Sequence, residues 1–173
     1  LRILEAGCGR TWAHKLSVPF ILTGLDVDPD ALAARADLDH AIVGDLRTAE
    51  FAPHSVDVIY NAFVLEHVRD LAPVMAECAR VVRGGGQLYL CELHPYRQLL
   101  GGQAQFTDPR TRETVHVPAF RHSVSEYVTT ALAAGFALRD LGEWLEAGAA
   151  ATDPPRLLSL LFDRDVRAAH PPG

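Results

Sequence analysis

Short apolar runs alternate with stretches of helical periodicity along the first ninety or so residues of the chain. Each apolar run ends at or just before a polar residue or a glycine, which is typical of strands that are buried on both faces of a parallel sheet. Five such strands are expected, over Leu1–Ala6, Phe20–Asp26, Ala41–Gly44, Val56–Asn61 and Gln87–Leu93.

Helical patterns lie between these strands. Pro29 can occupy the first turn of a helix, because its missing N–H costs little there, and Asp28 can cap that helix. A second helix is expected over Leu71–Val82, and Gly84-Gly85-Gly86 is predicted to stop it. The segment Thr11–Ser17 is compatible with a short helix.

The second half of the chain has a different pattern. A connection over residues 94–122, rich in proline and glycine, is long enough to suggest a functional loop. Ser123 and Glu126 then form a capping box that starts a helix. Two further strands, Phe136–Leu145 and Arg156–Phe162, are expected to be antiparallel neighbours.

This alternation predicts an α/β fold, with a parallel sheet and helices on both faces. Residues 1–165 are expected to form one domain, with 166–173 as a tail. A chain of 173 residues buries roughly 70% of its unfolded surface, which is enough for one full core. Because the sequence starts at Leu1, inside a predicted strand, we expect an upstream segment.

Composition narrows the functional classes. The net charge of −6 and the lack of a basic stripe argue against binding to nucleic acid. No apolar stretch reaches the ~20 residues that span a bilayer, so no membrane association is expected. The three cysteines, Cys8, Cys78 and Cys91, have no metal-ligand spacing, which predicts no metal site and a reducing, cytoplasmic setting.

Polar side chains gather at the ends of the first four predicted strands. Glu5 precedes a glycine turn, Asp26 and Asn61 end the second and fourth strands, and Asp45 follows the third. The carboxyl ends of parallel strands meet at one edge of a sheet, which is where open α/β sheets bind ligands. A binding site is therefore expected at that edge.

The segments that carry these residues resemble the motifs of the class I (Rossmann-like) S-adenosylmethionine-dependent methyltransferases, over nearly the whole chain. The matching segments are Leu4-Glu5-Ala6-Gly7-Cys8-Gly9, Thr23-Gly24-Leu25-Asp26, Gly44-Asp45-Leu46, Val56-Asp57-Val58-Ile59-Tyr60-Asn61-Ala62 with Leu65-Glu66-His67-Val68, and Ala79-Arg80-Val81-Val82-Arg83-Gly84-Gly85-Gly86. The resemblance implies a three-layer, doubly wound, seven-stranded sheet of order 3-2-1-4-5-7-6, mostly parallel with an antiparallel last strand. It also implies S-adenosylmethionine as cofactor, S-adenosylhomocysteine as product and a small-molecule acceptor.

The family's cofactor roles carry over to particular residues. Asp26 is expected to accept from two vicinal hydroxyls, as acids after such glycine loops do. By resemblance, Asp45 accepts from the adenine amine with the Leu46 N–H beside it, Asn61 lies near the methionine ammonium, and Glu5 orients the methionine end. The full set of expected cofactor-binding residues is Glu5, Gly7, Cys8, Gly9, Asp26, Val27, Asp45, Leu46, Asn61 and Ala62.

Methyl transfer from a sulfonium is a direct displacement, so alignment can supply most of the acceleration. A general base helps when the acceptor is a hydroxyl or an ammonium. The candidates are His94, His67 and His122, which follow the fifth strand, follow the fourth strand and precede the capped helix. The connection 94–122 is expected to cover the acceptor.

Other functions stay open. The same fold could bind without catalysis, as a regulatory domain. A nicotinamide-dependent oxidoreductase is disfavoured because Trp12 stands at the third glycine position of a dinucleotide fingerprint. Methylation of nucleic acid or protein is a weaker hypothesis, because Asn61-Ala62-Phe63-Val64 replaces the expected Asn-Pro-Pro-Tyr type of motif. The sequence leaves the acceptor atom and the oligomeric state undetermined.

Overall fold

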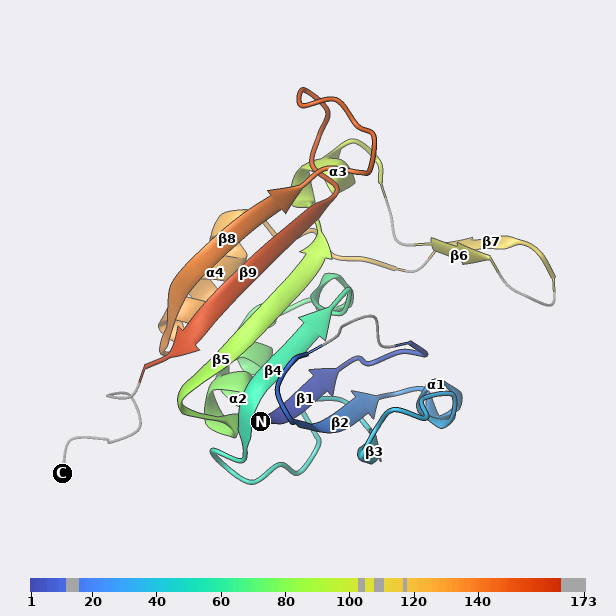
Figure 1. The fold of residues 1–173 in the computed structure, drawn as a ribbon. Helices are drawn as coiled ribbons and strands as arrows, with labels where there is room; N and C mark the ends of the chain where they lie inside the picture. The colour runs from blue at the N-terminus through green and yellow to red at the C-terminus, as the bar shows by residue number, and fades with distance from the viewer. Residues whose placement is uncertain (12–15, 103–104, 108–110, 117, 166–173) are drawn as a thin grey trace.

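A seven-stranded sheet forms the centre of the protein (Figure 1). The computed structural model describes residues 1–11, 16–102, 105–107, 111–116 and 118–165. The strands run in the spatial order β3-β2-β1-β4-β5-β9-β8, and β9 is antiparallel to both of its neighbours. The predicted α/β class and the order 3-2-1-4-5-7-6 are confirmed, with β8 and β9 as the sixth and seventh strands. The strands are β1 (Arg2–Ala6), β2 (Ile21–Asp26), β3 (His40–Val43), β4 (Val56–Ala62), β5 (Val82–Leu93), β8 (Phe136–Trp144) and β9 (Leu157–Arg164).

The helices begin where the sequence supplies caps. The Asp28 side chain accepts the N–H of Asp30 at the start of α1, and Ser123 accepts the N–H of Glu126 at the start of α4. Both predicted N-caps are therefore confirmed. The reciprocal half of the capping box is not formed, because the Glu126 carboxylate lies 2.8 Å from His122 Nδ1 instead. The helical segments are α1 (Pro29–Ala33), the 3-10 helix η1 (Leu65–His67), α2 (Leu71–Val81), α3 (Pro95–Leu99) and α4 (Val124–Ala133).

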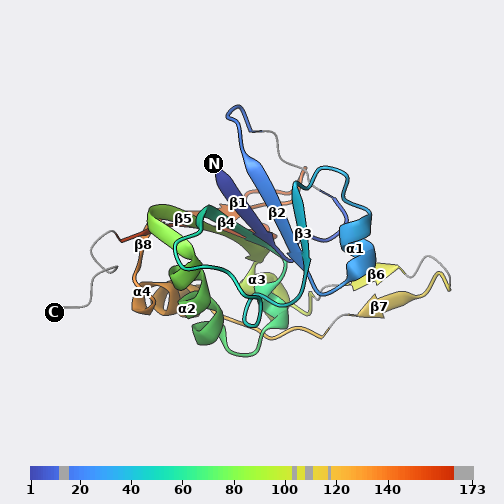
Figure 2. The same ribbon diagram turned by 90° about the horizontal axis from the view of Figure 1, so that it is seen from below.

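The core lies mainly between the sheet and the pair α2 and α4, which contact each other on one face (Figure 2). Leu4 and Ala6 of β1 point into this core, together with Met75 of α2. The opposite face of β1 carries Ile3 and Glu5, and α1 contacts β2 and β3. Alternate residues of β1 thus face different layers, as a central strand of a doubly wound sheet requires.

The predicted glycine stop after α2 is wrong. The helix ends at Val81, and Val82 is already extended and paired with Val56 of β4. The glycines instead lie inside β5, where the pairing with β4 shifts register. A Cβ on Gly86 would meet the backbone oxygen of Asp57, so this irregular stretch needs glycine for close approach.

The connection 94–122 contains regular structure. It begins with α3, and a hairpin of β6 (Gln105–Thr107) and β7 (Thr114–His116) projects from the body of the protein (Figure 1). The helix expected over Thr11–Ser17 falls mainly on residues 12–15, and the tail on 166–173; both lie outside the described residues. Within the described ranges, no helix has the length and apolar character that crossing a bilayer requires.

Candidate functional site

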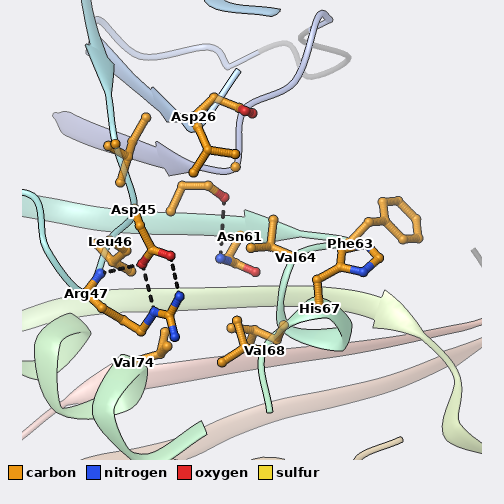
Figure 3. Close-up of a pocket in the computed structure, with 16 residues that line it drawn as sticks. Asp26, Asp45, Leu46, Arg47, Asn61, Phe63, Val64, His67, Val68 and Val74 are labelled. Carbon is orange, nitrogen blue, oxygen red and sulfur yellow. Dashed lines mark hydrogen bonds and ion pairs between the residues drawn. The ribbon is translucent and has the colours of Figure 1, made fainter. Parts of the chain in front are cut away.

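A cavity of about 330 Å³ opens at the carboxyl ends of the parallel strands (Figure 3). Its walls come from the segments that follow β1, β2, β3 and β4. The lining residues are Ala6, Gly7, Leu25, Asp26, Val27, Gly44, Asp45, Leu46, Arg47, Asn61, Phe63, Val64, Leu65, His67, Val68 and Val74. Of the predicted cofactor residues, Gly7, Asp26, Val27, Asp45, Leu46 and Asn61 are among them.

Asp26 ends β2 with its carboxylate held by two backbone groups. Oδ2 accepts the N–H of Gly9 at 2.8 Å, and Oδ1 accepts the N–H of Asp28 at 2.9 Å. A carboxylate has about four acceptor positions, so each oxygen keeps one for a ligand. Two fixed oxygens with one free position each match a pair of vicinal hydroxyls.

Asp45 is held by Arg47, which lines the same cavity (Figure 3). Oδ1 accepts the backbone N–H of Arg47 at 2.8 Å and its Nε at 2.9 Å, and Oδ2 accepts from Nη2. The Arg47 guanidinium lowers the pKa of the Asp45 carboxyl, which therefore stays ionised. One acceptor position remains on Oδ2, enough for one N–H donor such as an amine.

Asn61 is buried at the end of β4 and supplies an acceptor without a partner. Its Nδ2 donates to the carbonyl of Ala6 at 3.4 Å, while Oδ1 has no hydrogen-bond partner in the structure. A buried acceptor left unpaired is costly and indicates a missing donor. An ammonium group in the cavity would provide that donor.

The loop after β1 needs glycine for two different reasons. Gly7 and Gly9 both have positive φ, at 71° and 55°, where a side chain is strained. A Cβ on Gly7 would also overlap the Cγ2 of Val64, whereas a Cβ on Gly9 would meet nothing within 4 Å. Gly7 therefore allows the loop to pack against the segment that follows β4, and Gly9 provides backbone conformation alone.

Four predicted cofactor residues do not line the cavity: Glu5, Cys8, Gly9 and Ala62. Glu5 is buried on the far side of β1, where Oε2 accepts from Arg35 Nη2 at 2.7 Å. Arg35 also donates to the carbonyl of Cys8 at 2.6 Å. The Glu5–Arg35 ion pair therefore stabilises the glycine loop. Burial raises the pKa of the Cys8 thiol to about 11, which keeps it protonated near neutral pH.

Of the three candidate bases, His67 alone is among the residues that line this cavity. Its Nδ1 lies 2.8 Å from the carbonyl oxygen of Pro118, which accepts a hydrogen bond and so fixes the proton on Nδ1. Nε2 then carries the lone pair of the neutral ring. The nearest carboxylate oxygen to Nε2 is Glu66 Oε1, at 3.8 Å.

His94 and His122 are buried and engaged elsewhere. The Nδ1 of His94 accepts the N–H of Tyr96 at 3.1 Å, where it caps α3, and Nε2 lies 2.8 Å from Glu143. The ring nitrogens of His122 lie 2.8 Å from Glu126 and 2.7 Å from the carbonyl of Val68. Neither imidazole has a free nitrogen to offer a ligand.

Two buried carboxyls lie behind η1. Glu92 of β5 accepts the backbone N–H groups of Val64, Leu65 and Glu66 at 3.3, 3.1 and 3.4 Å. Burial raises the pKa of Glu92 to about 8 and also raises the pKa of Glu66. Glu92 therefore fixes the turn that carries His67.

Sequence reasoning missed Arg35, Arg47 and Glu92. Arg47 follows Asp45 at a spacing that favours a side-chain contact in a turn, so the sequence held a local signal for it. Arg35 and Glu92 act on residues about thirty positions away, and nothing local identifies their partners.

The chain is similar to known methyltransferases in sequence and in fold. The family profile described as "Methyltransferase domain" matches residues 4–90, slightly more than half of the chain. A probable S-adenosylmethionine-dependent methyltransferase of Mycolicibacterium smegmatis is 38% identical over 92 residues, which cover 49% of this chain and 35% of that protein. A ubiquinone biosynthesis O-methyltransferase of Rhizobium rhizogenes is 33% identical over 107 residues, covering 54% and 42%.

These alignments span only about a third to two fifths of the relatives' own length. Among solved structures, an S-adenosylmethionine-dependent methyltransferase from Mesorhizobium loti superposes with a TM-score of 0.73 at 21% identity, over 94% of this chain and 90% of that one. A similar protein from Listeria monocytogenes gives 0.74 at 16% identity, over 95% and 91%. At these identities the likeness establishes the shared fold.

Proposed function

The chain belongs to the methyltransferase domain family, within its class I S-adenosylmethionine-dependent group, and on this premise we propose that it methylates a small-molecule acceptor by direct in-line displacement. The observation that carries the proposal is the convergence of Asp26, Asp45 and Asn61 on one cavity at the carboxyl edge of the sheet. Their open hydrogen-bonding positions complement two hydroxyls, an amine and an ammonium.

S-adenosylmethionine supplies a methyl group that its sulfonium already activates, so no residue of the chain has to become a covalent nucleophile. Asp26 would hold the ribose hydroxyls, Asp45 and the Leu46 N–H the adenine, and Asn61 the amino-acid end. Gly7, Val27 and Leu46 add wall surface to the cavity. Their combined task is to fix the cofactor so that its methyl faces the acceptor.

We assign the general base to His67. Its Nε2 lone pair is free while the Pro118 carbonyl oxygen orients the ring. A neutral imidazole so held can take the proton from a hydroxyl as it attacks, or from an ammonium before the resulting amine attacks. His94 and His122 are better explained as parts of the scaffold, because their ring nitrogens are already hydrogen-bonded.

The small-molecule assignment rests on chemistry and on relatives. The lining of the cavity is mostly apolar, and the ubiquinone biosynthesis O-methyltransferases among the relatives act in the synthesis of a small molecule. The formal charge of −6 disfavours a nucleic-acid substrate. Three free cysteines support a reducing, cytoplasmic setting.

Calorimetric titration with S-adenosylhomocysteine tests the cofactor site. We expect micromolar affinity, with a loss of at least about tenfold in Asp26→Ala because two charge-assisted hydrogen bonds disappear. Asp30→Ala is the matched control, since that carboxylate lies outside the cavity. Absence of binding to the folded wild-type protein would refute the proposal.

His67→Gln separates catalysis from binding. We expect the affinity for S-adenosylhomocysteine to stay within about twofold, while turnover with an accepted substrate falls about 100-fold or more. Cofactor binding with no product from any pool of small metabolites would instead favour a non-catalytic binding domain.

A further inference from the structure

A second cavity, of about 270 Å³, lies between the end of α3 and the segment that precedes α4. It is lined by Gln98, Gly101, Gly102, Ala119, Phe120 and Arg121. Its volume is large enough for a small organic group, and its lining is more polar than that of the first cavity.

This second cavity is tied directly to the turn that carries His67. The backbone N–H of Phe120 donates to the carbonyl of Glu66 at 2.6 Å, and the side chain of Gln98 donates to Glu66 Oε2 at 3.2 Å. His67 itself is hydrogen-bonded to Pro118, one residue before the lining begins. The η1 turn, whose Leu65 and His67 line the cofactor cavity, is therefore hydrogen-bonded to residues that line the second cavity.

Unpaired positive charge gathers at this cavity. Most arginines in the described part of the chain form ion pairs with a carboxylate, as Arg47 does with Asp45. Arg164 donates to two backbone carbonyls instead. Among the described residues, the arginines with neither kind of partner are Arg69, Arg112 and Arg121.

One of these three arginines lines the second cavity, and another contacts a lining residue. Arg121 lines it, and the guanidinium of Arg69 lies over the ring of Phe120, 5.2 Å from the ring centroid. Both side chains are exposed and have no carboxylate partner among the described residues, so their charge is available to an anion from solution. A guanidinium is suited to planar, bidentate recognition of a carboxylate or phosphate.

We propose that the second cavity is the acceptor subsite, and that it binds an anionic group, a carboxylate or a phosphate, of a small acceptor. The inference rests on the proposed methyl transfer and names the substrate class for it. Arg121 and Arg69 hold the anion, and Phe120 packs against the adjoining apolar part. The acceptor then reaches past η1, where His67 faces the cofactor cavity.

Competing interpretations differ in what they predict. If Arg121 and Arg69 are only solvated surface groups, an anion and a neutral molecule of the same shape bind equally well. If Arg69 only packs on Phe120, its replacement changes stability but not the preference for charge. The decisive quantity is therefore the ratio of the affinity for the anion to the affinity for the neutral molecule of the same shape.

The test uses three probes on the protein saturated with S-adenosylhomocysteine. 4-Hydroxybenzoate and 4-hydroxybenzamide have the same shape and differ in charge, and phenyl phosphate replaces the carboxylate with a phosphate. We expect at least one of the two anions to bind about tenfold more tightly than the amide, with a preference that shrinks as ionic strength rises. The tighter anion identifies the group that the subsite takes.

Substitutions at single arginines show which residues cause the preference for anions. Arg121→Gln and Arg69→Gln should each reduce the preference to about threefold or less, whereas Arg112→Gln, an exposed and equally unpaired arginine outside the cavity, should leave it unchanged. Unaltered S-adenosylhomocysteine affinity shows that each variant is folded. Equal affinity for anions and amide, no binding of any probe, or an equal loss in Arg112→Gln overturns the proposal.

Failure of the proposed function gives a different result from failure of this subsite. A protein that does not bind S-adenosylhomocysteine lacks the cofactor site, and the probes are then titrated without it, so the charge preference is still measured. Cofactor binding without a charge preference leaves the methyl-transfer proposal standing and removes only the anionic acceptor.

Discussion

Replacing Glu92 with glutamine should make the protein more stable at high pH. Glu92 is almost fully buried on β5, and its three backbone donors lie at rather long distances of 3.1 to 3.4 Å. Burial, together with the neighbouring Glu66, raises the pKa of Glu92 from its ordinary value of 4.5 to about 8. The folded protein therefore holds a proton on Glu92 that the unfolded chain releases.

The sign and size of the effect follow from linkage. Because the folded state binds this proton more tightly, the contribution of Glu92 to stability is full below pH 4.5 and is lost as the pH rises toward 8. Between pH 5 and pH 9 the loss amounts to about 4 kcal/mol. That is a large fraction of the roughly 5–15 kcal/mol that stabilises a domain of ordinary size.

Urea denaturation at pH 5, 7 and 9 measures the free energy of unfolding of both proteins. Glu92→Gln should match the wild type within about 1 kcal/mol at pH 5, because glutamine is a neutral isostere that still offers an acceptor to η1. At pH 9 it should be more stable by about 3–5 kcal/mol. The difference between the two proteins cancels the titration of all other groups.

Glu113→Gln, at an exposed position, is the control and should show no such trend. A different outcome has a definite meaning: if Glu92→Gln is more destabilising at pH 9 than at pH 5, the carboxylate is ionised in the folded protein. The three backbone N–H groups would then outweigh burial, and the reasoning above would be refuted.

Two other perturbations test the support of the glycine loop. Gly7→Ala should destabilise the protein by about 2–4 kcal/mol, because alanine is strained at this positive φ and its Cβ overlaps Val64. Adding Val64→Ala should recover the destabilisation that the overlap causes. Thermal melts of the single and double variants separate the cost of the overlap from the cost of the backbone strain. Arg35→Met should lower the free energy of unfolding by about 3–5 kcal/mol, because it leaves Glu5 buried without a partner. Adding Glu5→Gln should restore most of that stability. A double-mutant cycle from urea denaturation checks this, and additive effects of the two substitutions would contradict it.

The architecture was accessible from the sequence because each strand carries its own signal. Short apolar runs bounded by glycine or acid predict buried parallel strands, and the capping residues Asp28 and Ser123 stand where their helices begin. The order of the strands came instead from resemblance to a family, and their register was not predicted. The end of α2 was mispredicted, because the helix ends at Val81 and the strand β5 begins at Val82, before the glycines.

The gathering of polar residues around the first cavity was predictable for the same local reason. Asp26, Asp45 and Asn61 stand at or just after strand ends, so the fold alone brings them to one edge. The role expected for Glu5 at the methionine end rests on resemblance to the family. The alternation of side chains along β1 instead directs Glu5 to the face where Arg35 contacts it. The alternation of side chains along the predicted strand was the sequence signal that could have placed Glu5 on that face.

The second cavity, proposed to bind the acceptor, could not be predicted in this way, because its geometry depends on contacts between distant segments. The turn η1 is fixed by Glu92 from β5, and the segment that lines the second cavity is fixed by hydrogen bonds to Glu66 and His67, about fifty positions earlier. No local sequence pattern at any of these residues predicts which distant residue it contacts. The same arrangement makes acceptor choice separable from cofactor binding, since residues 94–122 can change while the strand-end residues keep their positions. Substitutions at Arg121 should therefore alter which molecule is methylated without altering how the methyl donor is held.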